Sequence, residues 1–126
     1  MKKQELIHSH ILVAIFCGWE ACRPNKDFPN GYLKLEDDDD ETYKVSNDSI
    51  LEEIPYQTDR EYLTTAVKRF KEEITNEEIS NEQPLPELQK ISVEINAALG
   101  AGDYDRAFHE LVKGVEKYNQ FKLQEV

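Results

Sequence analysis

The sequence contains few of the residue arrangements that build enzyme active sites or zinc centres. Its two cysteines, Cys17 and Cys22, do not form a Cys-x-x-Cys pair, and no second pair completes a zinc site. Its five glycines form no phosphate-binding loop, and none of its serines lies in a glycine-flanked nucleophile elbow. We therefore expect no cofactor, no catalytic residue and two reduced thiols, which is typical of a cytoplasmic protein.

Metal-binding patterns are missing as well. His8 and His10 are two residues apart, so on a helix their side chains point to different sides and do not chelate one ion. The acidic run from Glu36 to Glu41 lacks the central glycine and the final glutamate of a calcium-binding loop. We expect no metal, with a weak and nonspecific divalent-cation site at this run as the alternative.

No apolar stretch of the sequence is long enough to cross a membrane. The run from Ile11 to Cys17 follows two lysines near the N-terminus, as in a signal peptide. However, Glu5 and two histidines precede it, and it is far shorter than the roughly 20 residues that a membrane helix needs. We expect neither export nor membrane association.

Basic residues are outnumbered, and the excess of acid is local. The formal net charge is −11, and residues 35–59 hold ten acidic residues against one basic residue, Lys44. Direct binding to nucleic acid is not expected, because that binding requires clustered lysine and arginine. The partner that this charge favours is a protein with a basic surface.

Apolar residues recur at helical spacing in four segments, and each has a start or stop signal. The segments are residues 3–17, 58–74, 85–99 and 103–119. Gly18 is placed to end the first helix in a left-handed conformation. Thr58 and Glu61 have the spacing of a capping box at the start of the second. Pro86 opens the third, and Asp103 is a good cap for the fourth.

Two short segments between the first and second helices alternate apolar and polar residues, as half-exposed strands do. They are residues 32–35 and 42–45, and the acidic run from Glu36 to Glu41 connects them. We predict an antiparallel hairpin with this run at its tip, extended because its like charges repel. Residues 50–54 are a candidate third strand, and residues 20–30 are expected to be loop.

These segments predict an α+β fold with an N-terminal helix, a β-hairpin or small antiparallel sheet, and three further helices. Residues 1–74 form a helix–hairpin–helix core in this interpretation, and residues 75–83 a polar linker. Residues 84–119 form a helical hairpin packed on the same core as one domain, and residues 120–126 a frayed tail. A small sheet covered by few helices leaves apolar faces that one copy buries poorly, so we expect a homo-oligomer, most simply a homodimer.

Three sequence patches carry a resemblance to a known group of proteins. They are Ala14 to Trp19, Pro55 to Leu63 with Val67 and Phe70, and Ile95 to Leu99 continued through Asn119. In these patches and in their order the chain resembles small uncharacterised proteins of Bacteroidetes and their phages, related in pattern to the phage ABA sandwich domain. It departs from that pattern in its acidic hairpin loop and at Glu116-Lys117. The resemblance implies a helix–hairpin–helix layout and a phage or prophage origin, and it implies no activity and no functional residues.

The strongest candidate site is the acidic hairpin with its neighbouring tyrosines. The expected partner-binding residues are Glu36, Asp37, Asp38, Asp39, Asp40, Glu41, Tyr32 and Tyr43. Exposed tyrosine beside acid is a plausible protein-binding face. A solvated loop with no partner is the alternative.

We therefore expect a non-catalytic interaction protein of phage type, for example an inhibitor of a host defence or nucleic-acid-handling protein. Two other functions remain open. One is a protein that binds or sequesters a nucleotide or metabolite, with arginines as anion anchors. These arginines are Arg23, Arg60, Arg69 and Arg106. The other is a structural or assembly component of a phage particle.

Overall fold

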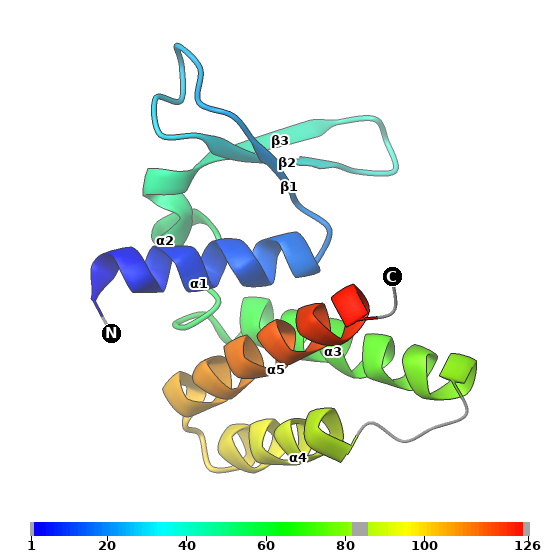
Figure 1. Ribbon diagram of the computed structural model, residues 1–126. Coiled ribbons are helices and arrows are strands. Elements are labelled where there is room, and N and C mark those ends of the chain that lie inside the picture. The colour runs from blue at the N-terminus through cyan, green and yellow to red at the C-terminus, as the bar shows by residue number, and fades with distance from the viewer. Residues whose placement is uncertain (1, 82–85, 125–126) are drawn as a thin grey trace. The chain divides into compact units, whose positions relative to one another are not determined.

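The computed structural model describes residues 2–81 and 86–124, and it has the α+β fold that the sequence predicts (Figure 1). The chain divides into two units, Met1–Pro55 and Tyr56–Val126. The described part of the first unit holds two helices, a 3₁₀ turn and a three-stranded sheet, and that of the second holds three helices. The boundary at Pro55 differs from the expected grouping of residues 1–74.

The first helix, α1 (Lys3–Phe16), ends where the sequence predicts. Gly18 has φ +107°. Its N–H donates to the carbonyl of Ile15 at 3.1 Å, and the Trp19 N–H donates to the carbonyl of Ala14 at 3.0 Å. This pair of bonds is a Schellman motif, which satisfies carbonyls at the end of a helix and needs a residue that tolerates positive φ.

Three antiparallel strands follow in the order β1-β2-β3: β1 (Glu20–Cys22), β2 (Tyr32–Glu36) and β3 (Thr42–Ser46). The predicted hairpin is confirmed as β2 and β3, in which Leu33 lies opposite Val45. The expectation that residues 20–30 are all loop is wrong, because β1 pairs with β2. A three-residue strand is too short to show an alternating pattern in the sequence.

The expected third strand at residues 50–54 is also wrong. These residues form the short helix α2 (Ile50–Glu53) after a 3₁₀ turn, η1 (Asn47–Ser49). The Ser46 hydroxyl accepts the Asp48 N–H at 3.2 Å and so starts the turn. The two buried isoleucines, Ile50 and Ile54, are four residues apart, a spacing that puts both on one face of a helix and equally on one face of a strand, so it did not decide between the two.

The first unit buries apolar side chains from α1, the sheet and α2. They are Ile7, Val13, Ala14, Leu33, Val45, Ile50 and Ile54. His10 is buried with them, and its Nδ1 lies 2.9 Å from the carbonyl oxygen of Leu6. Burial lowers the pKa of His10, because desolvation penalises the charged imidazolium. His10 therefore acts as a neutral core residue of α1 at neutral pH.

The second unit begins with the long helix α3 (Arg60–Asn81). The predicted Thr58–Glu61 capping box is wrong by one residue, because the Asp59 Oδ1 accepts the Glu61 N–H at 2.9 Å. Aspartate caps a helix as well as threonine does, so two neighbouring cap formers left the start ambiguous. The helix also continues beyond Ile74 through most of the expected linker, of which residues 82–83 lie outside the described ranges.

The last two helices, α4 (Pro86–Gly100) and α5 (Tyr104–Gln124), form the predicted helical hairpin. Gly102 ends α4 with φ +74°, and the Asp103 N–H donates to the carbonyl of Ala98 at 2.9 Å. The Asp103 side chain then accepts the backbone N–H of the third residue of α5 at 3.1 Å. Asp103 therefore closes α4 through its backbone N–H and caps α5 through its side chain, and the sequence predicted the cap.

The frayed tail expected after residue 119 is not observed, because α5 continues to Gln124 and residues 125–126 lie outside the described ranges. Phe121 lies in the last turn of this helix and is half-buried, so this part of the chain removes some apolar surface from water.

The α5 helix approaches its neighbours closely at Gly114. A Cβ atom at this position would lie 2.5 Å from the Cζ of Phe70 and 3.1 Å from the Cγ2 of Ile91. Phe70 is fully buried in α3. The packing of α5 against α3 and α4 therefore depends on a residue without a side chain.

We expect Gly114→Ala to destabilise the protein by about 1–3 kcal/mol, because the added methyl overpacks a filled core. The measurement is urea or thermal unfolding followed by circular dichroism. Gly100→Ala is the matched control, since its Cβ would meet no atom within 4 Å, and it should be neutral or slightly stabilising. If the two variants were equally stable, α5 would not pack as closely on Phe70 at Gly114 as the structure shows.

Candidate functional site

The acidic connection between β2 and β3 is a tight turn. The Asp37 N–H donates to the Glu41 carbonyl at 3.0 Å, and the Asp40 N–H donates to the Asp37 carbonyl at 3.2 Å. Asp40 has φ +62°. These features define a three-residue hairpin loop, with a type I turn followed by a left-handed residue. The expectation of an extended loop is wrong, although the charges are where the sequence placed them.

The Asp37 carboxylate holds this turn from within. Its Oδ1 accepts the N–H groups of Asp39 at 3.0 Å and of Glu41 at 2.9 Å. Its Oδ2 lies 3.1 Å from the hydroxyl of Tyr43, which donates to it, and the same hydroxyl lies 3.2 Å from the Glu41 carboxylate. These bonds to backbone amides and one phenol stabilise the turn and so offset part of the repulsion between neighbouring carboxylates.

The hydrogen bonds have opposite effects on the two titrating groups. The pKa of Asp37 lies below its usual value, chiefly because the backbone N–H of Glu41 stabilises the carboxylate. The pKa of Tyr43 lies above its usual value, chiefly because its hydroxyl hydrogen-bonds to the Asp37 carboxylate, with the contact to the Glu41 carboxylate as the next largest cause. Near neutral pH the site therefore holds an ionised Asp37 and a neutral Tyr43.

Three aspartates at the outside of the turn are left for solvent or a partner. Asp38, Asp39 and Asp40 are exposed, and no lysine or arginine in the described part of the chain makes an ion pair with them. Glu36 differs, because its carboxylate lies 3.7 Å from the Lys34 ammonium. The six acidic residues therefore divide into Asp37, which builds the turn, Glu36 and Glu41, which contact Lys34 and Tyr43, and the three exposed aspartates.

The structure separates the two tyrosines that were expected at this site. Tyr43 lies opposite Leu35, and Tyr32 lies opposite Ser46, so the two rings point to different faces of the sheet. The ring of Tyr32 stacks on Phe28 with centroids 4.8 Å apart. Tyr43 therefore belongs to the acidic tip, whereas Tyr32 belongs to the opposite face at the other end of the hairpin.

The face that carries Tyr32 holds a polar cluster that the sequence did not reveal. The Lys34 ammonium lies 3.6 Å from Glu20, and Cys22 lies opposite Tyr32. The pKa of Tyr32 is raised, first by a hydrogen bond with Cys22, and the pKa of Lys34 is raised by Glu20 and then by Glu36. Two members of this cluster come from β1, a strand without a sequence signal, so no pattern could have placed them here.

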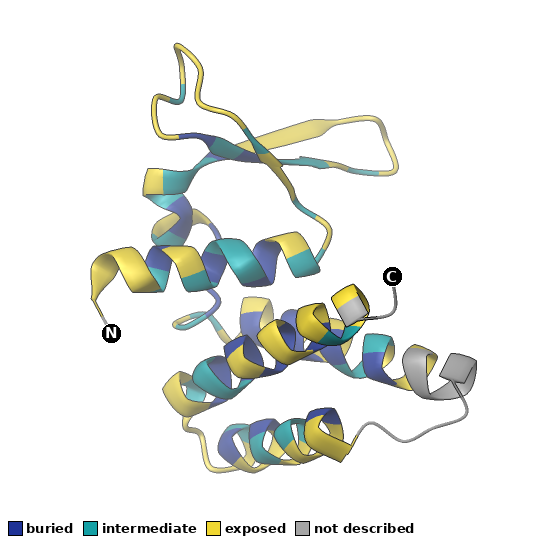
Figure 2. Ribbon diagram, viewed as in Figure 1, coloured by how far each residue is buried: buried dark blue, intermediate teal, exposed yellow. Residues whose placement is uncertain are grey.

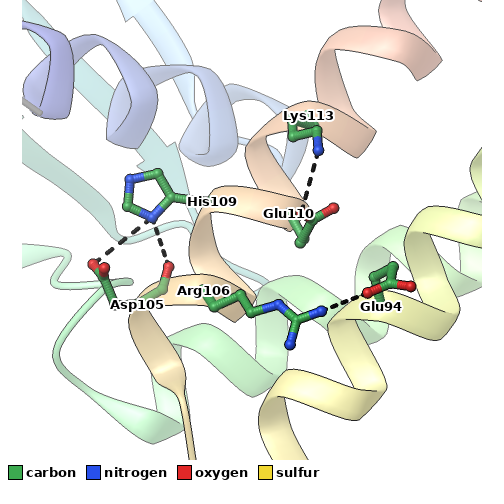
Figure 3. Close-up of polar contacts among 6 residues, drawn as sticks. All are labelled: Glu94, Asp105, Arg106, His109, Glu110 and Lys113. Carbon is green, nitrogen blue, oxygen red and sulfur yellow. Dashed lines mark hydrogen bonds and ion pairs between the residues drawn. The ribbon is translucent and has the colours of Figure 1, made fainter.

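The arginines proposed as anion anchors lie in both units. Arg23 is in the first unit, and Arg60 begins α3 in the second. Arg69 lies 3.3 Å from Glu73, and Arg106 lies 2.6 Å from Glu94, so both guanidinium groups are already engaged by carboxylates. Figure 3 shows the Arg106–Glu94 pair linking α5 to α4. These contacts stabilise the helices and give no support to a nucleotide or metabolite site.

The other contacts drawn in Figure 3 each join two residues of α5. The Nδ1 of His109 lies 2.7 Å from the carbonyl of Asp105, one turn earlier in α5, and Lys113 lies 3.2 Å from Glu110. Among the described side chains, no group of three or more histidine, cysteine, aspartate or glutamate residues is arranged to hold a metal ion.

No family model, curated protein or solved structure matches this chain. The resemblance to phage-type proteins therefore stays a prediction. Within residues 2–81 and 86–124, none of the helices has both the length and the apolar character that crossing a bilayer requires.

We expect Asp40→Gly to stabilise the first unit by about 0.5–1 kcal/mol, because glycine adopts positive φ without the steric cost that aspartate carries. The measurement is urea unfolding monitored by a probe of the sheet. Asp38→Gly is the control, since it removes the same charge but relieves no positive φ. If both variants change the stability equally, charge and not backbone conformation limits the turn.

Proposed function

We propose that this protein is a non-catalytic interaction protein that binds a basic surface of a partner protein through its acidic hairpin tip. The observation that carries the proposal is the arrangement of the tip. Asp38, Asp39 and Asp40 are exposed without ion pairs to described residues, on a turn whose shape Asp37 fixes.

The physical argument has two parts. Three adjacent carboxylates repel one another, because their separations are shorter than the Debye length of about 8 Å at physiological ionic strength. A partner that supplies lysine or arginine relieves this repulsion and adds attraction, which raises the association rate. Because the turn is already ordered, binding does not have to fix its backbone, and less conformational entropy is lost.

The proposal extends to the setting of the protein. A basic surface that a phage or prophage protein would meet is the nucleic-acid groove of a host nuclease or other defence protein, since such grooves bind phosphates. An acidic tip seated in that groove would inhibit the enzyme without any catalysis of its own. We place the protein in the cytoplasm, because its reducing environment keeps cysteines as free thiols, and Cys17 and Cys22 form no disulfide with each other.

The test is affinity capture from a host-cell lysate at low and high salt, followed by identification of the captured proteins. The tip variant carries Asp38→Asn, Asp39→Asn and Asp40→Asn. The control carries Glu5→Gln, Glu52→Gln and Glu53→Gln, three exposed acidic residues of the same unit. Both lose three negative charges, so they differ in position and not in net charge.

We expect the wild type and the control to retain a basic partner at low salt, and the tip variant to retain about tenfold less of it. High salt should release the partner from all three. If the tip variant captures the same proteins in the same amounts as the control, the acidic turn is a solvated loop and the proposed function is wrong.

A further inference from the structure

The apolar face of the hairpin continues beyond the core of the first unit. Leu33 and Val45 lie opposite each other and are buried, with 0% and 8% of their surfaces exposed. The next pair on the same face is Leu35 and Tyr43, of which Leu35 is half-buried and Tyr43 is 46% exposed. The same face therefore passes from core to solvent within two residues.

The position of the hairpin in its unit explains this exposure. In Figure 1 the turn between β2 and β3 lies at the far end of the hairpin from α2, which covers the other end. Figure 2 shows exposed residues along the outer part of β3 and around the turn. Leu35 and Tyr43 lie on this outer part, so α2 leaves them uncovered.

The exposed ring is held in a defined position. The Tyr43 hydroxyl lies within hydrogen-bond distance of both the Asp37 and the Glu41 carboxylates. The ring is therefore tied at its polar end to the turn, while its apolar part lies beside Leu35, its partner across the two strands. The result is a small apolar patch, Leu35 and Tyr43, with carboxylates along one rim.

We infer that the Leu35–Tyr43 patch takes an apolar side chain of the partner protein, while lysines or arginines next to that side chain pair with the acidic tip. This inference rests on the proposed function and specifies its recognition chemistry. The partner segment is an apolar residue flanked by basic residues. A purely basic segment would leave the apolar patch exposed, and a purely apolar segment would leave the carboxylates along its rim unpaired.

A second copy of this chain does not fit the same description. Each copy carries a net charge of −11, so two acidic tips brought to one interface would repel. A basic partner turns the same rim into an attraction. Charge complementarity therefore selects a foreign, basic segment as the occupant of the patch.

Two short peptides of equal charge test the inference, namely Lys-Lys-Phe-Lys-Lys and Lys-Lys-Ser-Lys-Lys. Each is titrated into the full-length ¹⁵N-labelled protein, and dissociation constants are taken from amide chemical-shift changes. The variants are Tyr43→Ser, which removes the ring from the patch, and Tyr62→Ser as the matched control. Tyr62 is 40% exposed, but it belongs to the second unit.

We expect the phenylalanine peptide to bind the wild type about fivefold more tightly than the serine peptide, which is the range of one aromatic contact. The difference should disappear in Tyr43→Ser and persist in Tyr62→Ser. The shifts should centre on the amides of residues 35–43. High salt should weaken both peptides but preserve their ratio, since apolar contact is not screened.

The two proposals fail in different ways. If both peptides bind equally and Tyr43→Ser changes nothing, the patch is not used, while the charge-based function stands. If both peptides bind the triple asparagine variant at Asp38, Asp39 and Asp40 as tightly as the wild type, the proposed function fails. If neither peptide binds at low salt, the result counts against both.

Discussion

Asp37 accepts two backbone N–H groups and the Tyr43 hydroxyl, and the acidic turn closes around these contacts. Six consecutive acidic residues would otherwise favour an extended loop, because adjacent carboxylates repel. One carboxylate used as a hydrogen-bond acceptor gives the turn its shape and leaves the neighbouring aspartates to face outward. The candidate site depends on this division of roles, since an extended loop would present no fixed pattern of charge.

The sequence predicted those parts of the fold that local chemistry determines. Gly18 ends α1 because a Schellman motif needs a residue that tolerates positive φ, and Asp103 caps α5 because its side chain reaches a backbone N–H in the first turn of that helix. Residues 50–54 were harder, since a short apolar segment fits either a strand or a helix until the preceding Ser46 cap is known. The three residues of β1 carry no period at all, and only pairing with β2 makes them a strand.

The candidate site was predicted in position but not in structure. The acidic run and its place at a hairpin tip follow from composition and alternation. The role of Asp37 does not, because it depends on which of four adjacent aspartates faces the backbone amides. The separation of Tyr32 from Tyr43 follows from the two-residue period of strands, but only once the strand register is known, and the length of the turn sets that register. What the structure adds for function is therefore a shaped turn, with one tyrosine tied to it and an apolar neighbour at its side.

The pKa of the Asp37 carboxyl, measured by ¹³C NMR titration of the folded protein, tests this account most directly. A carboxylate that accepts these hydrogen bonds is stabilised in its charged form, so its pKa is lowered from 3.8. Asp37 then stabilises the folded protein fully at a pH above its ordinary pKa, and this stabilisation is lost as the pH falls through the lowered pKa. The account expects a pKa below 3.8. It also expects the chemical shift of the Glu41 amide, which donates to the Asp37 carboxylate, to change over the same pH range. An Asp37 pKa at or above the ordinary value would show that its carboxylate does not hold the turn.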